Sequence, residues 1–135
     1  TVLALLVGAA IADGHIGSVD DPLGRYVKGL PPERAALSLR SLLEMASGLR
    51  TPPESSDPAS PYWQSVFGDD LRAAMAHWPL AEPARTRFAY ANANSQYLGW
   101  AIEAATGERY ARYLSRRLWR PLGAGDARLW LDRRG

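Results

Sequence analysis

The stretch FAYANANSQYLGWAIEAATG, residues 88–107, decides the fold of this 135-residue chain. From Asn94 onward its apolar residues return every three or four positions, the spacing that places side chains on one face of a helix. They are Tyr97, Leu98, Ala101, Ile102 and Ala105. Gly107 follows, and glycine readily adopts the left-handed conformation that ends a helix. The stretch therefore predicts a helix over 94–106 with one apolar face.

Tyr90 and Asn92 stand directly before this helix, two residues apart. In an extended backbone such residues project from the same side, so the phenol and the carboxamide would point to one place. A phenol can shuttle a proton, and a carboxamide both donates and accepts hydrogen bonds. From these residues alone two interpretations are open. The pair is either a candidate catalytic site or a buried tyrosine followed by an asparagine that caps the helix.

Outside this stretch, the spacing of apolar residues and the positions of Ser, Asp, Gly and Pro predict further helices. The first covers 2–12 and ends near Asp13-Gly14, and the second covers 39–46 and is capped by Ser38. The third covers 71–78, is started by Asp69-Asp70 and is stopped by Pro79. The fourth covers 108–120, with Tyr110, Leu114 and Leu118 buried and its arginines in solvent. The Pro- and Ser-rich residues 50–61 predict a long surface loop and a candidate lid. Short runs such as 127–131 are the candidates for strand, so the chain is expected to be mainly helical.

Composition excludes several classes of function. The net charge of +2 gives no strong field for nucleic acid or an anionic membrane, and the absence of cysteine excludes disulfides, zinc fingers and thiol nucleophiles. The apolar run 2–12 is too short to span a bilayer. No His-Glu-x-x-His, Gly-x-Ser-x-Gly or Gly-x-x-x-x-Gly-Lys motif occurs, and no Ser-x-x-Lys pair includes Lys28. The adjacent Asp20 and Asp21 precede a proline, which favours turn bonding over acid–base chemistry.

Five ordered motifs carry a resemblance that covers nearly the whole chain. They are VLALLVG at 2–8; DGHI at 13–16 with VDDP at 19–22; LRSLLEMASGL at 39–49; YANANSQYLG at 90–99; and YL at 113–114 with LWRPLGA at 118–124 and WLD at 130–132. In this order and spacing they resemble the β-lactamase-related serine hydrolases. That family includes class C β-lactamases, penicillin-binding proteins, class VIII esterases and 6-aminohexanoate-oligomer hydrolases.

The resemblance implies an α+β fold of the β-lactamase and DD-peptidase type. This chain would supply its mainly α-helical subdomain and lack most of the antiparallel sheet, so that residues 1–135 form one partial serine hydrolase domain. The family's nucleophilic Ser-x-x-Lys is expected just before Thr1, and its Lys-Thr-Gly or His-x-Gly strand after Gly135. The resemblance therefore predicts an internal fragment that is inactive alone and poorly soluble, because the apolar helix over 2–12 has lost its covering sheet.

By resemblance, the parent protein cleaves amide or ester bonds of small molecules through an acyl-enzyme, with no metal or organic cofactor. Tyr90 would be the catalytic base and proton donor, and Asn92 would orient the lysine and bind the carbonyl region of the substrate. The substrate stays open among β-lactams, D-alanyl peptides, esters and 6-aminohexanoate oligomers, as do the compartment and the oligomeric state. Two other functions also stay open: a non-catalytic homologue that binds peptide or peptidoglycan-like ligands, and a stand-alone helical interaction domain.

One departure from the family pattern lies just before Tyr90. The family usually places Pro-Gly-(Ser/Thr) ahead of its Phe-x-Tyr, whereas this chain has Pro83-Ala84-Arg85-Thr86 and no glycine. If the turn requires a positive φ, Ala or Arg there is strained. We expect such strain to displace Tyr90 and lower catalytic efficiency rather than change the fold.

Overall fold

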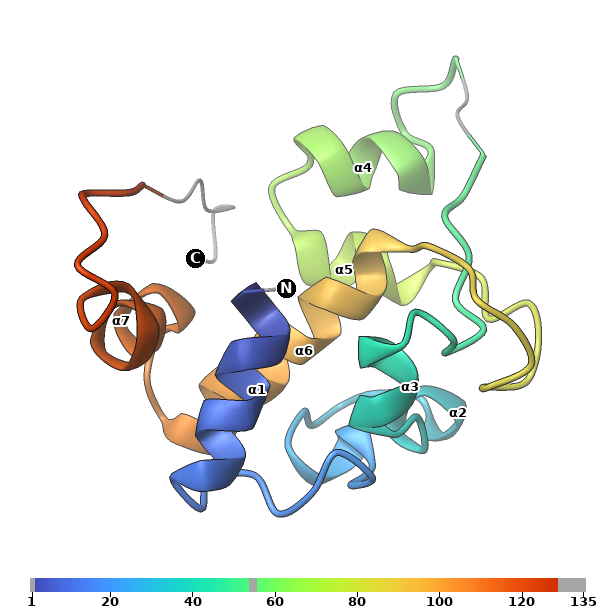
Figure 1. Cartoon of the computed structure of the whole chain (residues 1–135). Helices are drawn as coiled ribbons and strands as arrows, with labels where there is room; N and C mark the ends of the chain where they lie inside the picture. Colours follow the sequence, from blue (N-terminus) through green and yellow to red (C-terminus); the bar gives the residue numbers. More distant parts are fainter. Residues whose placement is uncertain (1, 54–55, 129–135) are drawn as a thin grey trace.

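Helix α6, Asn92–Thr106, lies at the centre of the computed structural model, and α1, α3 and α7 pack against it (Figure 1). It confirms the helix predicted over 94–106, although it begins two residues earlier. Gly107 ends it with a φ of 68°, as expected. The predicted apolar face is buried except for Ala105, which is half-buried. This helix therefore supplies the middle of the core.

The structure describes residues 2–53 and 56–128, and within these ranges it contains helices, turns and isolated bridges but no strand. The α-helices besides α6 are α1 (Val2–Ala12), α2 (Pro32–Ala35), α3 (Leu39–Leu43), α4 (Pro61–Phe67), α5 (Leu71–Ala76) and α7 (Tyr110–Leu114). Two further helical segments are not α-helices: a 3₁₀ turn, η1 (Leu23–Arg25), and a π-helical turn, η2 (Ser115–Trp119). The mainly helical character predicted from the sequence is confirmed.

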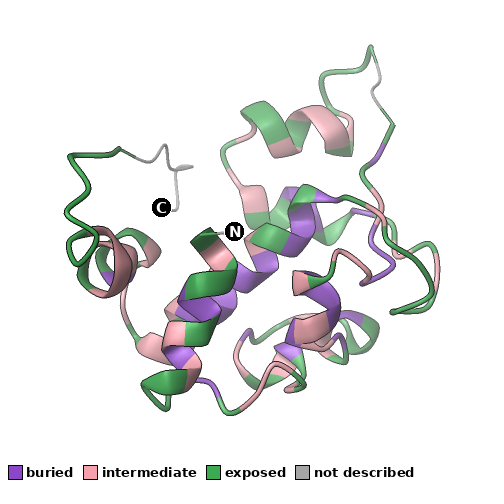
Figure 2. Ribbon diagram, viewed as in Figure 1, coloured by how far each residue is buried: buried purple, intermediate pink, exposed green. Residues whose placement is uncertain are grey.

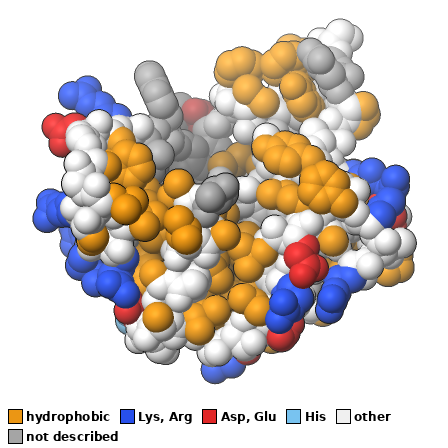
Figure 3. All heavy atoms as spheres, in the orientation of Figure 1, with side chains coloured by type: hydrophobic (Ala, Val, Ile, Leu, Met, Phe, Trp, Pro, Cys, Tyr) orange, Lys and Arg blue, Asp and Glu red, His pale blue; other side chains and the backbone are white. Residues whose placement is uncertain are grey.

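Helix α1 is apolar throughout but is buried on only one side. Leu6, Val7 and Ala10 are buried in the core against α6, whereas Val2 and Leu5 are 40% and 54% exposed. Figure 2 shows exposed and buried residues alternating along this helix, and Figure 3 shows hydrophobic side chains gathered on the face where α1 lies. The sequence indicates a helix packed on every side, so an apolar strip of α1 stays open in this chain.

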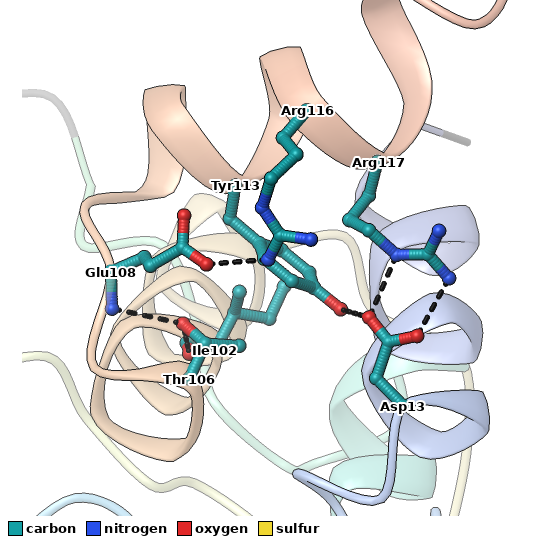
Figure 4. A network of polar contacts seen from close by, with 7 residues as sticks. All are labelled: Asp13, Ile102, Thr106, Glu108, Tyr113, Arg116 and Arg117. Atoms are coloured by element: carbon teal, nitrogen blue, oxygen red, sulfur yellow. Dashed lines mark hydrogen bonds and ion pairs between the residues drawn. The ribbon is translucent and has the colours of Figure 1, made fainter.

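The C-terminal end of α1 is joined to the last helical segment by a charged contact (Figure 4). The Asp13 carboxylate accepts a hydrogen bond of 2.9 Å from the Tyr113 hydroxyl and two of 2.7 Å from the Arg117 guanidinium. The Tyr113 hydrogen bond and the Arg117 charge lower the pKa of Asp13. Burial and the same carboxylate raise the pKa of Tyr113. This contact joins residues about 100 positions apart and closes α7 and η2 onto α1.

Several predicted boundaries are wrong, each for a local reason. Helix α3 ends at Leu43 instead of residue 46, because Met45 adopts a φ of 53°. The single helix predicted over 108–120 divides into α7 and η2, and it buries Tyr113 completely while Tyr110, Leu114 and Leu118 are only partly buried. Helix α4 was not predicted, although Ser60 caps it and Pro61 begins it.

The expected helix caps and the turn before Pro22 are borne out. Helix α5 is capped by Asp70, as the sequence indicates, although it ends at Ala76 rather than at residue 78, and Ser38 caps α3. Asp21 accepts a hydrogen bond from the Ser18 amide in the predicted turn. In the candidate strand 127–131, residues 127 and 128 form no strand and 129–131 lie outside the described residues. Residues 51–53 and 56–60 are irregular, as predicted for the surface loop. No helix among the described residues is long and apolar enough to cross a membrane.

The adjacent leucines of α1 give a direct test of its one-sided burial. Leu6 is fully buried, so Leu6→Ala should lower the free energy of unfolding by about 2–5 kcal/mol. Leu5 is exposed, so Leu5→Ala should change it by about 0.5 kcal/mol at most. Urea unfolding followed by circular dichroism measures both. Equal losses in the two variants would contradict the orientation of α1.

The contact at Asp13 predicts a pH-dependent stability. A carboxyl whose pKa is lower in the folded protein stabilises the fold above its unfolded value, 3.8 for Asp, and loses that effect as the pH falls towards the lowered pKa. Asp13→Asn should therefore lower the melting temperature at pH 7, and its difference from the wild type should shrink below about pH 4. The exposed Asp126→Asn is the matched control. A difference that stays constant from pH 7 to pH 2.5 would rule out this role for Asp13.

Candidate functional site

The structure brings the two residues singled out from the sequence into direct contact. The Tyr90 hydroxyl donates a hydrogen bond of 2.7 Å to Oδ1 of Asn92. Tyr90 is 65% exposed and Asn92 is also exposed, so both side chains are open to solvent. The Thr51 hydroxyl lies 3.5 Å from the Tyr90 carbonyl oxygen, which places the start of the 50–61 loop beside this pair. A phenol and a carboxamide therefore meet at the surface.

The alternative interpretation of a buried tyrosine and a capping asparagine is wrong. Ala91, not Asn92, precedes α6 in an extended conformation, and no side chain caps this end of the helix. Asn92 is already the first residue of α6, whereas Ala91, between the two side chains, has the expected extended backbone. Asn92 uses its carbonyl oxygen for Tyr90, and both side chains lie on the outside. Packing of Tyr90 or capping by Asn92 does not explain this arrangement.

A buried pair of polar residues positions the start of α6. The Ser47 hydroxyl donates a hydrogen bond of 2.5 Å to Oδ1 of Asn94, and both residues are almost completely buried. The Asn94 amide nitrogen lies 3.3 Å from the sulfur of Met45, and the Leu49 amide lies 3.2 Å from the Ser47 hydroxyl. The turn after α3 is therefore tied to the first turn of α6, directly beneath the exposed pair.

Ser47 and Asn94 were not predicted to bond to each other, although both lie inside the quoted motifs. The signal that was present is helical periodicity. If the helix is extended back to residue 92, Asn92 and Asn94 lie about 200° apart around its axis. One of them must then face the core, where an amide requires a hydrogen-bond partner.

The segment 80–90, which leads to Tyr90, lies against the turn at 45–50. Backbone amides of Ala81, Arg85 and Ala89 donate to carbonyl oxygens in this turn over 2.9, 2.6 and 2.8 Å. Gly48 makes the approach possible, because its φ is 87° and a Cβ there would lie 2.0 Å from the Glu82 carbonyl oxygen. Only glycine fits this position, so the Ser-Gly-Leu turn determines where the segment runs.

Glu82 adds charged contacts to the same segment. Its carboxylate pairs with the Arg50 guanidinium and accepts hydrogen bonds of 2.9 Å from Nε of Arg87. Arg50 follows the turn at 45–49, and Arg87 lies three residues before Tyr90. One partly buried carboxylate therefore joins both sides of the loop that presents the tyrosine. These contacts limit the movement of the segment relative to the core.

The turn that lacks the family's glycine does adopt the conformation that favours glycine. Arg85 has a φ of 65°, and it is one of two non-glycine residues with a positive φ among those the structure describes. A side chain there costs about 1 kcal/mol or more. The Arg85 guanidinium forms an ion pair with the Glu44 carboxylate at 4.0 Å, but both groups are exposed, so this ion pair offsets little of the cost. Strain is therefore present next to Tyr90, as the sequence indicated.

The remaining candidates do not form a second catalytic centre. His15 lies against the ring of Tyr113, 6.3 Å between centroids, on the contact between α1 and α7. Asp20 pairs with Arg40 and Asp21 with Tyr26, so each carboxylate serves the turn rather than a shared substrate. Within the described ranges no cluster of His, Asp or Glu could hold a metal ion.

Comparison with known proteins identifies the family. The family model described as Beta-lactamase matches residues 1–135, so the chain belongs to the beta-lactamase family. It is 31% identical over 150 residues to the 6-aminohexanoate-dimer hydrolase of Paenarthrobacter ureafaciens, which covers 96% of this chain and 36% of that protein. The resemblance indicated by the five motifs is thereby confirmed.

Solved structures agree on the fold. The chain is similar to the crystal structure of SurE, with a TM-score of 0.69, 31% identity and coverage of 93% of this chain and 26% of that one. It is also similar to the penicillin binding protein from Bacillus halodurans, with a TM-score of 0.70, 24% identity and coverage of 90% and 39%. The predicted β-lactamase and DD-peptidase-like fold class is confirmed. The chain spans 26–39% of the length of these relatives.

The strain at Arg85 predicts a stabilising substitution. Arg85→Gly should raise the free energy of unfolding by about 0.5–1 kcal/mol, because glycine adopts the observed φ without steric cost. Ala84→Gly is the matched control, since residue 84 has no positive φ and glycine there should destabilise by about 0.4–1 kcal/mol. Thermal and urea unfolding measure both. A loss of stability in Arg85→Gly would show that the turn is not strained.

Proposed function

We propose that this chain forms the helical part of a serine hydrolase domain that cleaves amide or ester bonds through an acyl-enzyme, with Tyr90 as its proton-transfer residue. The observation that carries the proposal is the exposed contact between Tyr90 and Asn92, 2.7 Å between phenol and carboxamide oxygens. It lies on a segment fixed from below by Ser47 and Asn94. Membership of the beta-lactamase family supports a hydrolase.

The proposed chemistry assigns each residue a distinct part. The nucleophile would be a serine of a Ser-x-x-Lys motif that precedes α1 in the complete domain. For this step Tyr90 must be the phenolate, which the ammonium group of the motif's lysine would favour in the complete domain. As the serine oxygen attacks the carbonyl carbon of the substrate, the phenolate accepts the hydroxyl proton, and the resulting phenol then donates it to the departing amine or alcohol. Water releases the acyl group in a second step, again with Tyr90 moving the proton. The third motif of the domain would follow residue 135, on a strand that forms part of the oxyanion hole.

Asn92 is proposed to orient both the Tyr90 hydroxyl and the substrate through hydrogen bonds. Its Oδ1 accepts the bond from Tyr90, which leaves its amide N–H groups available for the carbonyl region of a substrate. The 6-aminohexanoate-dimer hydrolase that this chain resembles supports a small amide substrate. We therefore favour short linear amides as the first substrates to test, with esters as the second group.

The proposal is tested in the complete domain, with residues before Thr1 and after Gly135 restored. Tyr90→Phe should lower kcat by about 10²-fold or more, because general acid–base catalysis contributes on that scale. Tyr110→Phe in α7 is the matched control and should leave kcat unchanged. A fluorescent phosphonate that reacts with activated serines should label the serine of a Ser-x-x-Lys upstream of α1.

Two results would contradict the proposal. Unchanged turnover in Tyr90→Phe would exclude Tyr90 from proton transfer. A complete domain with neither labelling nor a Ser-x-x-Lys motif, yet with binding of peptide ligands, would instead identify a non-catalytic homologue.

A further inference from the structure

A pocket lies away from the Tyr90–Asn92 pair, among the 27–34 segment, α5 and α6. Its volume is about 150 Å³, and neither Tyr90 nor Asn92 lines it. Apolar side chains form most of its surface, including those of Val27, Leu30, Tyr97 and Trp100. A volume of this size is sufficient for one molecule about as large as benzene.

Three cationic side chains also line this pocket, and no Asp or Glu of the described residues does so. They are Lys28, Arg34 and Arg72. The Lys28 ammonium donates to two backbone carbonyl oxygens, those of Gly24 and Arg25, over 3.0 and 2.9 Å. The Arg72 guanidinium lies over the Trp100 ring, 4.6 Å from its centroid. The pocket therefore has a positive side and an aromatic side that meet at Trp100.

Arg34 is the buried member of the three, only 6% exposed. Its guanidinium donates to the carbonyl oxygens of Met75 and Trp78 over 3.1 and 2.5 Å and to the Tyr97 hydroxyl over 3.0 Å. All of these acceptors are neutral, and Nε of Arg34 has no partner among the described residues. Buried charges in proteins are normally compensated by an opposite charge. Partial compensation comes from the carbonyl groups of Met75, near the end of α5, and of Trp78, just after it, so positive potential is left at the pocket.

We propose that this pocket binds a small organic carboxylate, with its apolar body against Trp100 and Tyr97 and its charged group towards Arg72. A guanidinium matches a carboxylate through two parallel hydrogen bonds, and the positive potential of Arg34 and Lys28 adds to that attraction. The ligand would occupy a site separate from the one proposed for catalysis. The inference stands whether or not the chain belongs to an active hydrolase.

Benzoate and benzamide are the matched probes, because they share a ring and differ in charge. The protein is labelled with ¹⁵N, and the indole N–H signal of Trp100 is assigned by its absence in Trp100→Phe. Benzoate should move this signal saturably at pH 7, and benzamide should bind at least about ten-fold more weakly, the loss expected for one charge-assisted interaction. Inorganic phosphate tests whether charge alone suffices and should bind more weakly than benzoate, since it cannot use the aromatic side.

Arg72→Gln tests the assigned role without removing the buried hydrogen bonds of Arg34. It should weaken benzoate binding by about ten-fold, whereas Arg112→Gln, an exposed arginine of α7, should leave binding unchanged. Unchanged circular dichroism confirms that each variant is folded. Equal affinities for benzoate and benzamide, equal effects of the two substitutions, or no saturable shift at Trp100 would each overturn the proposal.

Discussion

The buried hydrogen bond between Ser47 and Asn94 is the constraint on which the arrangement of the candidate site depends. It joins the turn after α3 to the first turn of α6 at a place where water cannot replace a lost partner. Leaving either group unpaired there costs about 1–3 kcal/mol. Because the segment leading to Tyr90 lies on the same turn, a chemically simple bond in the interior fixes the position of an exposed phenol.

Conformations that side chains normally avoid gather around this bond. Met45 and Arg85 both have a positive φ, and Gly48 adopts a φ that only glycine tolerates at such close range to Glu82. Strain of this kind persists where surrounding contacts determine the backbone, which is common at functional sites. The contact that joins Asp13 to Tyr113 and Arg117 is different, since it closes α7 onto α1 through ordinary charged hydrogen bonds.

The sequence predicts the long helix and the family well, because both depend on repeated or ordered signals. Periodicity alone identified α6, and Gly107 gave its end. The start of α6 was misplaced because Asn92 and Asn94 are equally good turn residues, and only the position of Ser47 in space decides which of them lies inside. Helix α4 was overlooked because the Pro- and Ser-rich residues 50–61 at its start suggested a loop, and its Ser60 cap is a short local signal. The pocket beside Arg34 joins residues from three distant segments, which no spacing along the chain reveals.

The opposite orientations of Asn92 and Asn94 restrict how this region can vary in length. Adding one residue between Asn92 and Asn94, inside the first turn of α6, would rotate one amide relative to the other by about 100°, so that the two could not both face their present partners. A change in the number of residues between Thr51 and Ser60 is not subject to this helical periodicity and adds little loop-closure free energy. Related chains should therefore differ freely in the loop beside the site, while the five residues from Tyr90 to Asn94 keep a fixed count.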